Sequence, residues 1–245
     1  MMISVIVCTY NREKYLYDTL CKIAENDYPV TKYELLLVDN NSTDGTKVLW
    51  EKFAEKYPQV DFSYFQEPRQ GLSFARNRGI VEAKFKYLVF LDDDSFVSED
   101  YLKNLDSYLA QYPDAMAWGG KIDPVFESGT NPKWICKWTY SWVSAIDMGK
   151  ETTMFKGNAF PIGANMGFRK SCLDTIGMFN TELGRTKKNL MGGEEKDIFN
   201  RAKAYGMNIY YFPNIEIQHV IPPTRTTKDY IIRLGEGVGM SEQLR

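Results

Sequence analysis

The first ninety residues alternate between short apolar runs and longer amphipathic segments. The apolar runs predict buried strands at residues 3–8, 34–38, 60–65 and 87–91. The amphipathic segments carry apolar residues at helical spacing and predict helices at residues 13–25, 46–56 and 72–84. A strand-helix alternation of this kind predicts a mostly parallel sheet covered by helices on both faces.

The remainder of the chain is less regular. We expect helices at residues 98–112 and 194–205, a short helix from residue 171, and strands at residues 115–121, 208–212 and 215–221. An aromatic-rich connection at residues 124–160 leads to a strand or loop at residues 160–168. The glycine-rich run at residues 235–239 follows no strand, so we expect it to be a flexible end. No low-complexity linker separates the halves, which predicts one compact body with a join near Asp94.

Composition and charge narrow the classes of function. The chain has 245 residues, a net charge of -2 and no long basic block, so nucleic acid is not an expected partner. Its four cysteines are far apart, which suggests neither a zinc site nor a disulfide framework and favours a cytoplasmic protein. The apolar N-terminal run is too short to span a membrane, so we expect a protein that is soluble or at most peripheral at the membrane's inner face.

Polar residues gather where three of the predicted strands end, at residues 9–12, 39–46 and 92–94. Parallel sheets bind ligands at the carboxyl ends of their strands, where loops converge and helix N-termini point their N–H groups inward. The three clusters are therefore candidates for a binding site.

The third cluster places Asp92, Asp93 and Asp94 side by side directly after a strand. Adjacent carboxylates raise each other's pKa unless water or a cation relieves the repulsion. A solvated acidic loop is one interpretation, but the position at the end of the sheet favours a metal site. Oxygen ligands favour Mg²⁺ or Mn²⁺, which complete their shells with water and substrate phosphates, so a bound diphosphate is implied.

Three other classes of enzyme fit these residues less well. Haloacid dehalogenase phosphatases carry a D-x-D motif on their N-terminal strand with Gly-Thr after it, whereas this motif follows the fourth strand and continues with Ser95 and Phe96. Dinucleotide-binding oxidoreductases and nucleotidyltransferases need glycines in the first strand-to-helix turn, and the run CTYNREKY has none.

Six segments, in order, resemble family 2 glycosyltransferases of the GT-A fold. They are VIVCTYNR, LLLVDNNSTDGT, EPRQGLSFARNRGI, YLVFLDDD, PIGANMGFRK and GGEEKDIFNR, with a looser match, HVIPPTRTTKDYIIR, to residue 233. The resemblance implies a Rossmann-like lobe at residues 1–94 that binds a nucleotide sugar, fused to a smaller lobe at residues 95–245 that binds the acceptor and supplies a base. It implies inverting transfer from a nucleoside-diphosphate sugar, commonly UDP-linked, to a hydroxyl of a glycan or lipid-linked acceptor.

The resemblance also assigns roles on the donor side. Thr9 and Tyr10 would contact the nucleoside, and Asp39 would accept a hydrogen bond from the base, which suits a carboxylate because uracil and ribose offer N–H and O–H donors. Asp92 and Asp93 would lie near ribose and phosphate.

Two residues are candidates to hold the implied cation, Mn²⁺ or Mg²⁺. The resemblance makes Asp94 a direct ligand, and the metal would stabilise the charge that builds on the leaving diphosphate. His219, the only histidine, follows a predicted strand at a position where some relatives of the fold supply a metal or diphosphate contact. A packed, hydrogen-bonded side chain is the alternative for His219.

An inverting displacement needs a base on the face opposite the diphosphate. The family places it at the second acid of a G-E-D motif, which here reads Gly193, Glu194, Glu195. We expect Glu195 to be the base, with Glu194 second. The alternative is that these acids only interact with the dipole of a helix N-terminus. Because Glu replaces the usual Asp, a catalytically silent nucleotide-sugar-binding subunit is the second hypothesis.

The acceptor side is marked more weakly. Asn165 matches a family segment that lines the acceptor site, with a hydrogen-bonded core asparagine as the alternative. Trp134, Trp138 and Trp142 recur every four residues, which on a helix places them on one face, either in the core, against a sugar or at a membrane edge. The basic residues near the C-terminus are expected to be solvated charges, with contact to anionic lipid or a diphosphate as the alternative: Arg225, Lys228 and Arg233.

Overall fold

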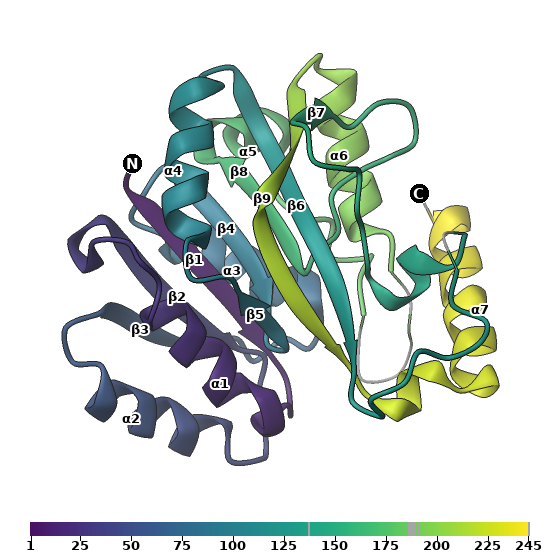
Figure 1. The fold of residues 1–245 in the computed structure, drawn as a ribbon, viewed down its shortest axis with the longest axis horizontal. Helices are drawn as coiled ribbons and strands as arrows, with labels where there is room; N and C mark the ends of the chain where they lie inside the picture. The colour runs from purple at the N-terminus through teal and green to yellow at the C-terminus, as the bar shows by residue number, and fades with distance from the viewer. Residues whose placement is uncertain (137, 186–189, 191, 245) are drawn as a thin grey trace.

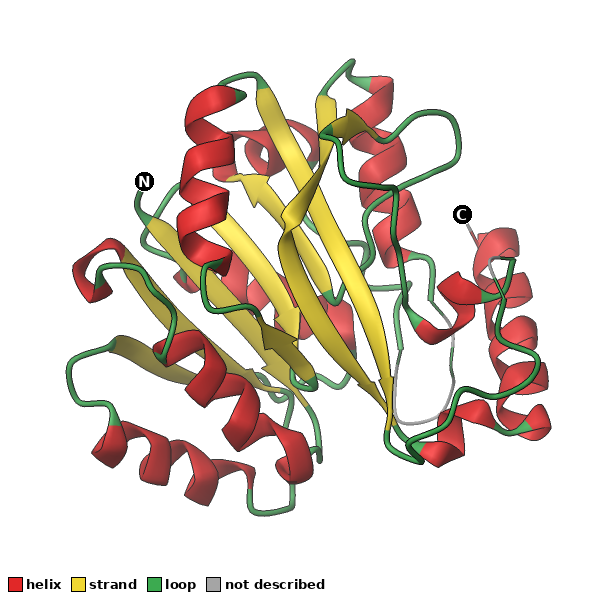
Figure 2. Ribbon diagram, viewed as in Figure 1, coloured by secondary structure: helices red, strands yellow, loops and turns green. Residues whose placement is uncertain are grey.

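The computed structural model describes residues 1–136, 138–185, 190 and 192–244. Within them, nine strands form a single sheet that runs across the whole molecule, as Figure 1 shows. Helices lie over both faces of this sheet (Figure 2). Among the described residues, no helix is both long and apolar enough to cross a membrane.

The N-terminal half forms the elements that the apolar pattern predicts. Its strands are β1 (Ile3–Thr9), β2 (Tyr33–Asp39), β3 (Asp61–Gln66) and β4 (Tyr87–Asp92). Its helices are α1 (Glu13–Ala24), the short η1 (Val30–Lys32), α2 (Thr46–Lys56) and α3 (Leu72–Glu82). The four strands are parallel, so the carboxyl ends of β1, β2 and β4 lie at one edge of the sheet.

The C-terminal half continues the same sheet with strands of mixed direction. Its strands are β5 (Ser95–Val97), β6 (Ala115–Phe126), β7 (Thr153–Met154), β8 (Asn165–Arg169) and β9 (Asn208–Ile221). Its helices are α4 (Tyr101–Gln111), η2 (Tyr140–Val143), α5 (Lys170–Ile176), α6 (Glu194–Ala204), η3 (Pro223–Thr226) and α7 (Lys228–Leu244). The strand order is β3-β2-β1-β4-β8-β6-β9-β5, with β7 paired to β9. Because β8 lies antiparallel to both β4 and β6, it joins the two halves.

One long strand replaces two predicted ones. The segments at residues 208–212 and 215–221 form the single strand β9, which passes through Pro213. Proline has no N–H for the ladder, and the pairing of β6 with β9 shifts register across this stretch, between Phe212 and Ile217. The uninterrupted strand carries His219 to a position opposite Ser95, next to the acidic loop.

The glycine-rich run at residues 235–239 is helical, so the prediction of a flexible end is wrong. The buried residues of α7 are Leu234, Gly237 and Ser241, which recur about once per helical turn. A helical glycine is roughly 1 kcal/mol less favourable than alanine, and packing of this face offsets that cost. The small residues permit a close approach, since a Cβ added to Gly193 would lie 3.0 Å from the Ser241 side chain.

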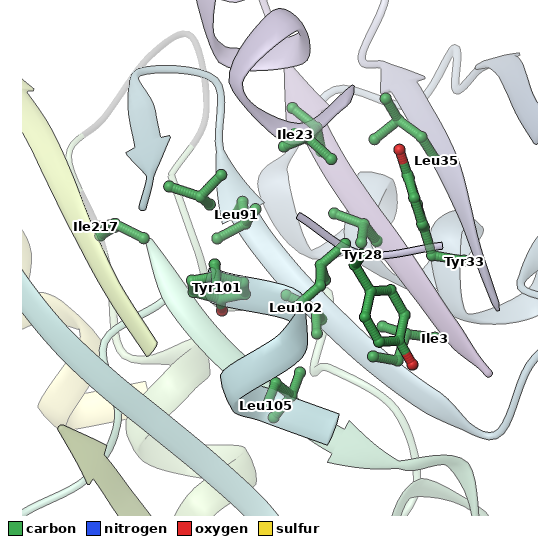
Figure 3. Close-up of a cluster of buried hydrophobic side chains, with 14 of the residues drawn as sticks. Ile3, Ile23, Tyr28, Tyr33, Leu35, Leu91, Tyr101, Leu102, Leu105 and Ile217 are labelled. Atoms are coloured by element: carbon green, nitrogen blue, oxygen red, sulfur yellow. The ribbon is translucent and has the colours of Figure 1, made fainter. Parts of the chain in front are cut away.

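The two faces of the sheet carry separate apolar cores. Helices α1, α2 and α4 cover one face, which includes Ile3 and Val5, and α3, α5 and α6 cover the other, which includes Ile6. Figure 3 shows the first core, where Tyr101 of α4 lies near Leu91 of β4. Both faces of β1 and β2 are buried, which explains why these strands read as continuous apolar runs.

A buried asparagine supports the irregular pairing of β6 and β9. The Asn165 side chain is fully buried, and its Oδ1 accepts a hydrogen bond from the Tyr101 hydroxyl at 2.6 Å. Its Nδ2 donates to the carbonyl oxygens of Ile215 at 2.8 Å and Lys121 at 3.2 Å. Both carbonyls lie where the register shifts, so the amide binds acceptors that the ladder leaves unpaired.

Replacement of Asn165 by alanine is expected to lower the free energy of unfolding by about 2–4 kcal/mol, because it leaves a buried hydroxyl and buried carbonyls unpaired. Urea denaturation of the variant measures this loss. Asn104→Ala is the matched control, since that exposed amide makes one bond to the Asn214 carbonyl oxygen. A loss below about 1 kcal/mol for Asn165→Ala would contradict a structural role.

Candidate active site

A cavity opens at the carboxyl ends of β1, β2 and β4. The end of β1 and the loop after it contribute Thr9, Tyr10 and Arg12 to its wall, and the end of β4 and the loop after it contribute the three adjacent aspartates. Residues from later in the chain close the other side: Arg185 and Arg225. Residues from all three polar clusters at the strand ends therefore line one cavity, which we call the first cavity.

Asp94 is the most enclosed of the three aspartates. Its Oδ1 lies 3.0 Å from Nε2 of His219, while its Oδ2 is in contact with the Arg12 guanidinium and 3.8 Å from that of Arg225. Burial acts to raise the pKa of Asp94, but the neighbouring His219, Arg225 and Arg12 outweigh it and hold that pKa well below its usual value. Asp94 is therefore a carboxylate at any ordinary pH.

Asp93 accepts hydrogen bonds from the first strand, β1, and from the first helix, α1. The Thr9 hydroxyl donates to its Oδ2 at 2.6 Å, and the Thr19 hydroxyl donates to its backbone carbonyl at 2.9 Å. Burial, together with the charge of Asp94, raises the pKa of Asp93 to about 7, against the opposing effect of Arg12. This carboxyl fixes the loop, whereas the Asp92 side chain stays half exposed in the cavity.

The cluster of Asp92, Asp94 and His219 fits a divalent cation. One ligand atom from each residue lies within 4.8 Å of the others. Among the described residues, Nδ1 of the fully buried His219 has no hydrogen-bond partner, and Nε2 faces Asp94 without the geometry of a hydrogen bond. Two carboxylates and an imidazole suit Mn²⁺ and also Mg²⁺, which leave the remaining positions to water or phosphate.

Tyr10, which the sequence analysis expects to contact a nucleoside, lines the first cavity together with Asn40. Asp39 is buried next to Asn40 and does not line this cavity. Its carboxylate accepts hydrogen bonds from the Ser42 backbone N–H at 2.8 Å and from the Tyr64 hydroxyl. A nucleobase that donates a hydrogen bond to Asp39 would have to displace the Tyr64 hydroxyl or bind the carboxylate together with it.

A second, larger cavity of about 610 Å³ adjoins the first one. It is enclosed by the N-terminus of α6, by η2 and by α7, and both Glu194 and Glu195 line it. Apolar side chains form much of its wall: Leu72, Trp142, Phe160, Ile162, Leu190, Leu234 and Val238. A ligand with an apolar face and hydroxyl groups would suit these surroundings.

Both acids are bound by one buried guanidinium. Nη1 of Arg76 lies 2.9 Å from Oε1 of Glu194, and Nη2 lies 3.2 Å from Oε1 of Glu195 and 3.9 Å from Oδ1 of Asp92. Burial raises the pKa of Glu195 to about 7, and repulsion from Glu194 adds to this, while Arg76 opposes it. A carboxyl with this pKa, at the wall of a cavity, has the properties of a general base.

Of the residues expected on the acceptor side, Asn165, Trp134 and Trp138 do not line either cavity. Asn165 lies in the core, and Nε1 of Trp134 donates to the Thr226 carbonyl at 3.3 Å within a small apolar cluster. Trp138 is 78% exposed. The tryptophan segment is mostly irregular among its described residues, as a connection is expected to be, with one short helix, η2. The Thr139 side chain bonds the Trp134 carbonyl and the Cys136 backbone N–H there. Trp142 alone of the three lines the second cavity.

The sequence analysis anticipated the arginines of the site only in part. Arg225 was expected to be a solvated charge, but it lines the first cavity beside Asp94, whereas Arg233 does pair with Asp229 at the surface. Arg76 stands within the segment EPRQGLSFARNRGI, and its position on an amphipathic helix gave no reason to expect a fully buried cation. Arg12 belongs to the polar cluster at residues 9–12 that the sequence marks as a candidate binding site, and it does line the first cavity.

The chain is similar to known glycosyltransferases. Residues 4–177 match the family model described as glycosyl transferase family 2. Glycosyltransferase AglE of Haloferax volcanii is 35% identical over 181 residues, which cover 74% of this chain and 57% of AglE. TarS of Staphylococcus aureus, a poly(ribitol-phosphate) beta-N-acetylglucosaminyltransferase, is 32% identical over 112 residues, which cover 46% of this chain and 19% of TarS.

Two solved structures share the architecture. The crystal structure of S. aureus TarS in complex with UDP-GlcNAc has a TM-score of 0.69 at 22% identity and covers 90% of this chain and 59% of that chain. The mannosyltransferase PcManGT from Pyrobaculum calidifontis, in complex with GDP-Man and Mn²⁺, has a TM-score of 0.67 at 23% identity and covers 90% of this chain and 57% of that chain. The chain thus spans less than two thirds of the length of these proteins. With the GT-A fold of these structures and a family match over most of its length, the chain belongs to glycosyl transferase family 2.

Proposed function

We propose that this chain is the catalytic part of an inverting, metal-dependent transferase that moves a hexosyl or N-acetylhexosaminyl group from a nucleoside-diphosphate sugar to a hydroxyl. The donor is proposed to be UDP-linked and the acceptor a glycan or a lipid-linked glycan. One observation carries the proposal: a cavity with a cluster that fits a cation adjoins a cavity with a half-buried acid of raised pKa, and Asp92 lines both.

The first cavity is proposed to hold the donor. Its nucleoside would lie between Tyr10 and Asn40, and its diphosphate near Arg12 and Arg225. Asp92, Asp94 and His219 would hold the cation, which when bound neutralises charge on the diphosphate. The complexes of TarS with UDP-GlcNAc and of PcManGT with GDP-Man and Mn²⁺ support a nucleotide sugar at such a site.

The second cavity is proposed to hold the acceptor. Glu195 would take the proton of the acceptor hydroxyl, because its carboxylate reaches the cavity while Glu194 lies deeper and is almost fully buried. Arg76 keeps the Glu195 carboxylate at one position through the contact at 3.2 Å. The apolar wall supports an acceptor whose sugar or lipid part offers an apolar face.

The proposed setting is the cytoplasm, with at most peripheral contact to the inner face of the membrane. Cys8, Cys21 and Cys172 are free thiols, and Cys21 and Cys172 are buried in the core. Free thiols are typical of a reducing compartment.

Nucleotide binding is expected to depend on the cation and on Asp94. At a hundredfold excess over its dissociation constant, a ligand that binds only the folded state stabilises it by about 2.7 kcal/mol, or roughly 5–10 °C in melting temperature. Thermal melts with UDP, GDP, CDP and dTDP, with and without Mn²⁺, measure this. One diphosphate should raise the melting temperature only with Mn²⁺, and Asp94→Ala should abolish the shift.

The control for this experiment is Asp229→Ala, because Asp229 is an exposed residue of α7 that pairs only with Arg233 among the described residues. It should retain the full shift. If no nucleoside diphosphate stabilises the parent protein, the proposed donor site is wrong.

Substitution of Glu195 by Gln keeps the size of the side chain and removes its basicity. Turnover of the donor should fall by roughly 10²- to 10⁴-fold, the usual contribution of a general base, while the melting shift with diphosphate and Mn²⁺ should persist. Glu236→Gln, on the exposed side of α7, is the control and should retain activity. A parent protein that binds nucleotide sugar but never turns it over would instead favour the silent binding subunit.

The pH profile provides a second readout of the same residue. A base acts only when ionised, and the pKa of Glu195 is raised to about 7, so the rate should fall as pH drops below about 7 and level off above it. The residual activity of Glu195→Gln should lack this limb. An unchanged limb in the variant would assign it to another group.

A further inference from the structure

Arg185 lies where the two cavities meet. Of the described residues that line them, three belong to both walls: Leu72, Asp92 and Arg185. If the nucleotide occupies the first cavity and the acceptor the second, the bond that breaks must lie at this junction. A charged side chain at the junction is therefore within reach of the reacting atoms.

Within the part of the chain that the structure describes, the guanidinium of Arg185 has no acidic partner at ion-pair distance, unlike the other arginines that line the cavities. Arg12 and Arg225 both lie against Asp94, and Arg76 binds Glu194 and Glu195. Among the described residues, no carboxylate oxygen lies within 4.0 Å of the Arg185 side chain. Its positive charge is thus available to a ligand, and the half-buried position keeps water from screening it fully.

The chain around Arg185 is fixed to the start of α3. The Arg185 carbonyl accepts a hydrogen bond from the Leu72 backbone N–H at 3.1 Å, and the Leu183 carbonyl accepts one from the Ser73 hydroxyl at 2.8 Å. Gly184, between them, has φ of 103°, and a Cβ there would lie 2.9 Å from the Ser73 hydroxyl oxygen. The backbone that presents the guanidinium therefore has a defined position relative to the first cavity.

We propose that Arg185 is a catalytic residue that binds the β-phosphate of the donor and stabilises the leaving diphosphate. This inference rests on the proposed function. In the step, a bond forms between the acceptor oxygen and the anomeric carbon while the bond from that carbon to the β-phosphate oxygen breaks. The bonding electron pair stays on the nucleoside diphosphate, and the acceptor proton passes to Glu195.

The chemistry of the guanidinium suits this role. It stays charged at every accessible pH and donates paired hydrogen bonds to phosphate oxygens in a fixed planar geometry. Burial acts to lower the pKa of Arg185, but the nearby Tyr230, Glu195 and Asp92 outweigh it, and the pKa is raised overall. The guanidinium is therefore charged in this position. The charge that grows on the β-phosphate during bond cleavage would strengthen this contact in the transition state.

Binding of the nucleoside mono- and diphosphates tests the contact without turnover. The probes are the diphosphate that stabilises the parent most in the presence of Mn²⁺, and the matching monophosphate, measured by calorimetry. Arg185→Gln should weaken diphosphate binding roughly 10- to 100-fold, as expected for a charge-assisted hydrogen bond, and change monophosphate binding less than about threefold. Arg185→Lys should lie between the parent and Arg185→Gln.

Turnover of the same nucleoside's sugar donors gives the second readout. In Arg185→Gln, kcat should fall by about 10²-fold or more, with a smaller change in KM for the donor, since the contact strengthens in the transition state. Guanidinium ion added to Arg185→Ala should restore part of the rate. Arg78→Gln is the matched control, because that arginine pairs with Glu82 on the surface of α3.

The outcomes separate the inference from the function on which it rests. If the parent binds no nucleoside diphosphate, both are overturned. If the parent binds and turns over donor but Arg185→Gln weakens mono- and diphosphate alike, or raises only the KM for acceptor, the inference alone is overturned. Loss of diphosphate selectivity together with rescue by guanidinium supports it.

Discussion

The buried guanidinium of Arg76 sets the geometry of the candidate site. A cation taken out of water is tolerated only if carboxylates surround it, so α3 and α6 must bring Arg76, Glu194 and Glu195 together for the chain to fold. The contact demands space as well, since a Cβ on Gly163 would lie 2.2 Å from Nη2 of Arg76 and 2.0 Å from Oε1 of Glu195. The Arg76 side chain also lies 3.9 Å from Asp92, which lines the first cavity, and it thereby fixes the proposed base close to that cavity.

The two proposed chemical roles follow from two different environments of a carboxyl group. Asp94 faces His219 and two arginines, which hold its pKa below the usual value and suit it to a cation. Glu195 shares one guanidinium with a second acid in a buried setting, which raises its pKa to about 7 and suits it to accept a proton. When the environments of two acids in one site give them different pKa values, one acid can bind a cation while the other accepts a proton.

The elements that depend on local pattern were predictable, and those that depend on distant contacts were not. The N-terminal strands and helices, and the Asp92–Asp94 cluster at their end, follow from apolar periodicity and strand position. The unbroken β9 depends on Asn165, which binds carbonyls that Pro213 and the register shift leave unpaired, and no local signal reports that contact. The helical state of α7 likewise depends on packing of Ser241 against Gly193. Arg225 looked like a solvated charge because only the path of η3 and α7 brings it to Asp94.

The stereochemistry of transfer tests most directly whether Glu195 and the diphosphate lie on opposite sides of the sugar. Proton NMR, recorded as the enzyme hydrolyses an α-linked nucleotide sugar, identifies the anomer released before the free sugar equilibrates. A single displacement with Glu195 as base predicts the β anomer first, and its early signal should be lost in Glu195→Gln. Release of the α anomer first would require two displacements or attack from the diphosphate side, and it would contradict the account.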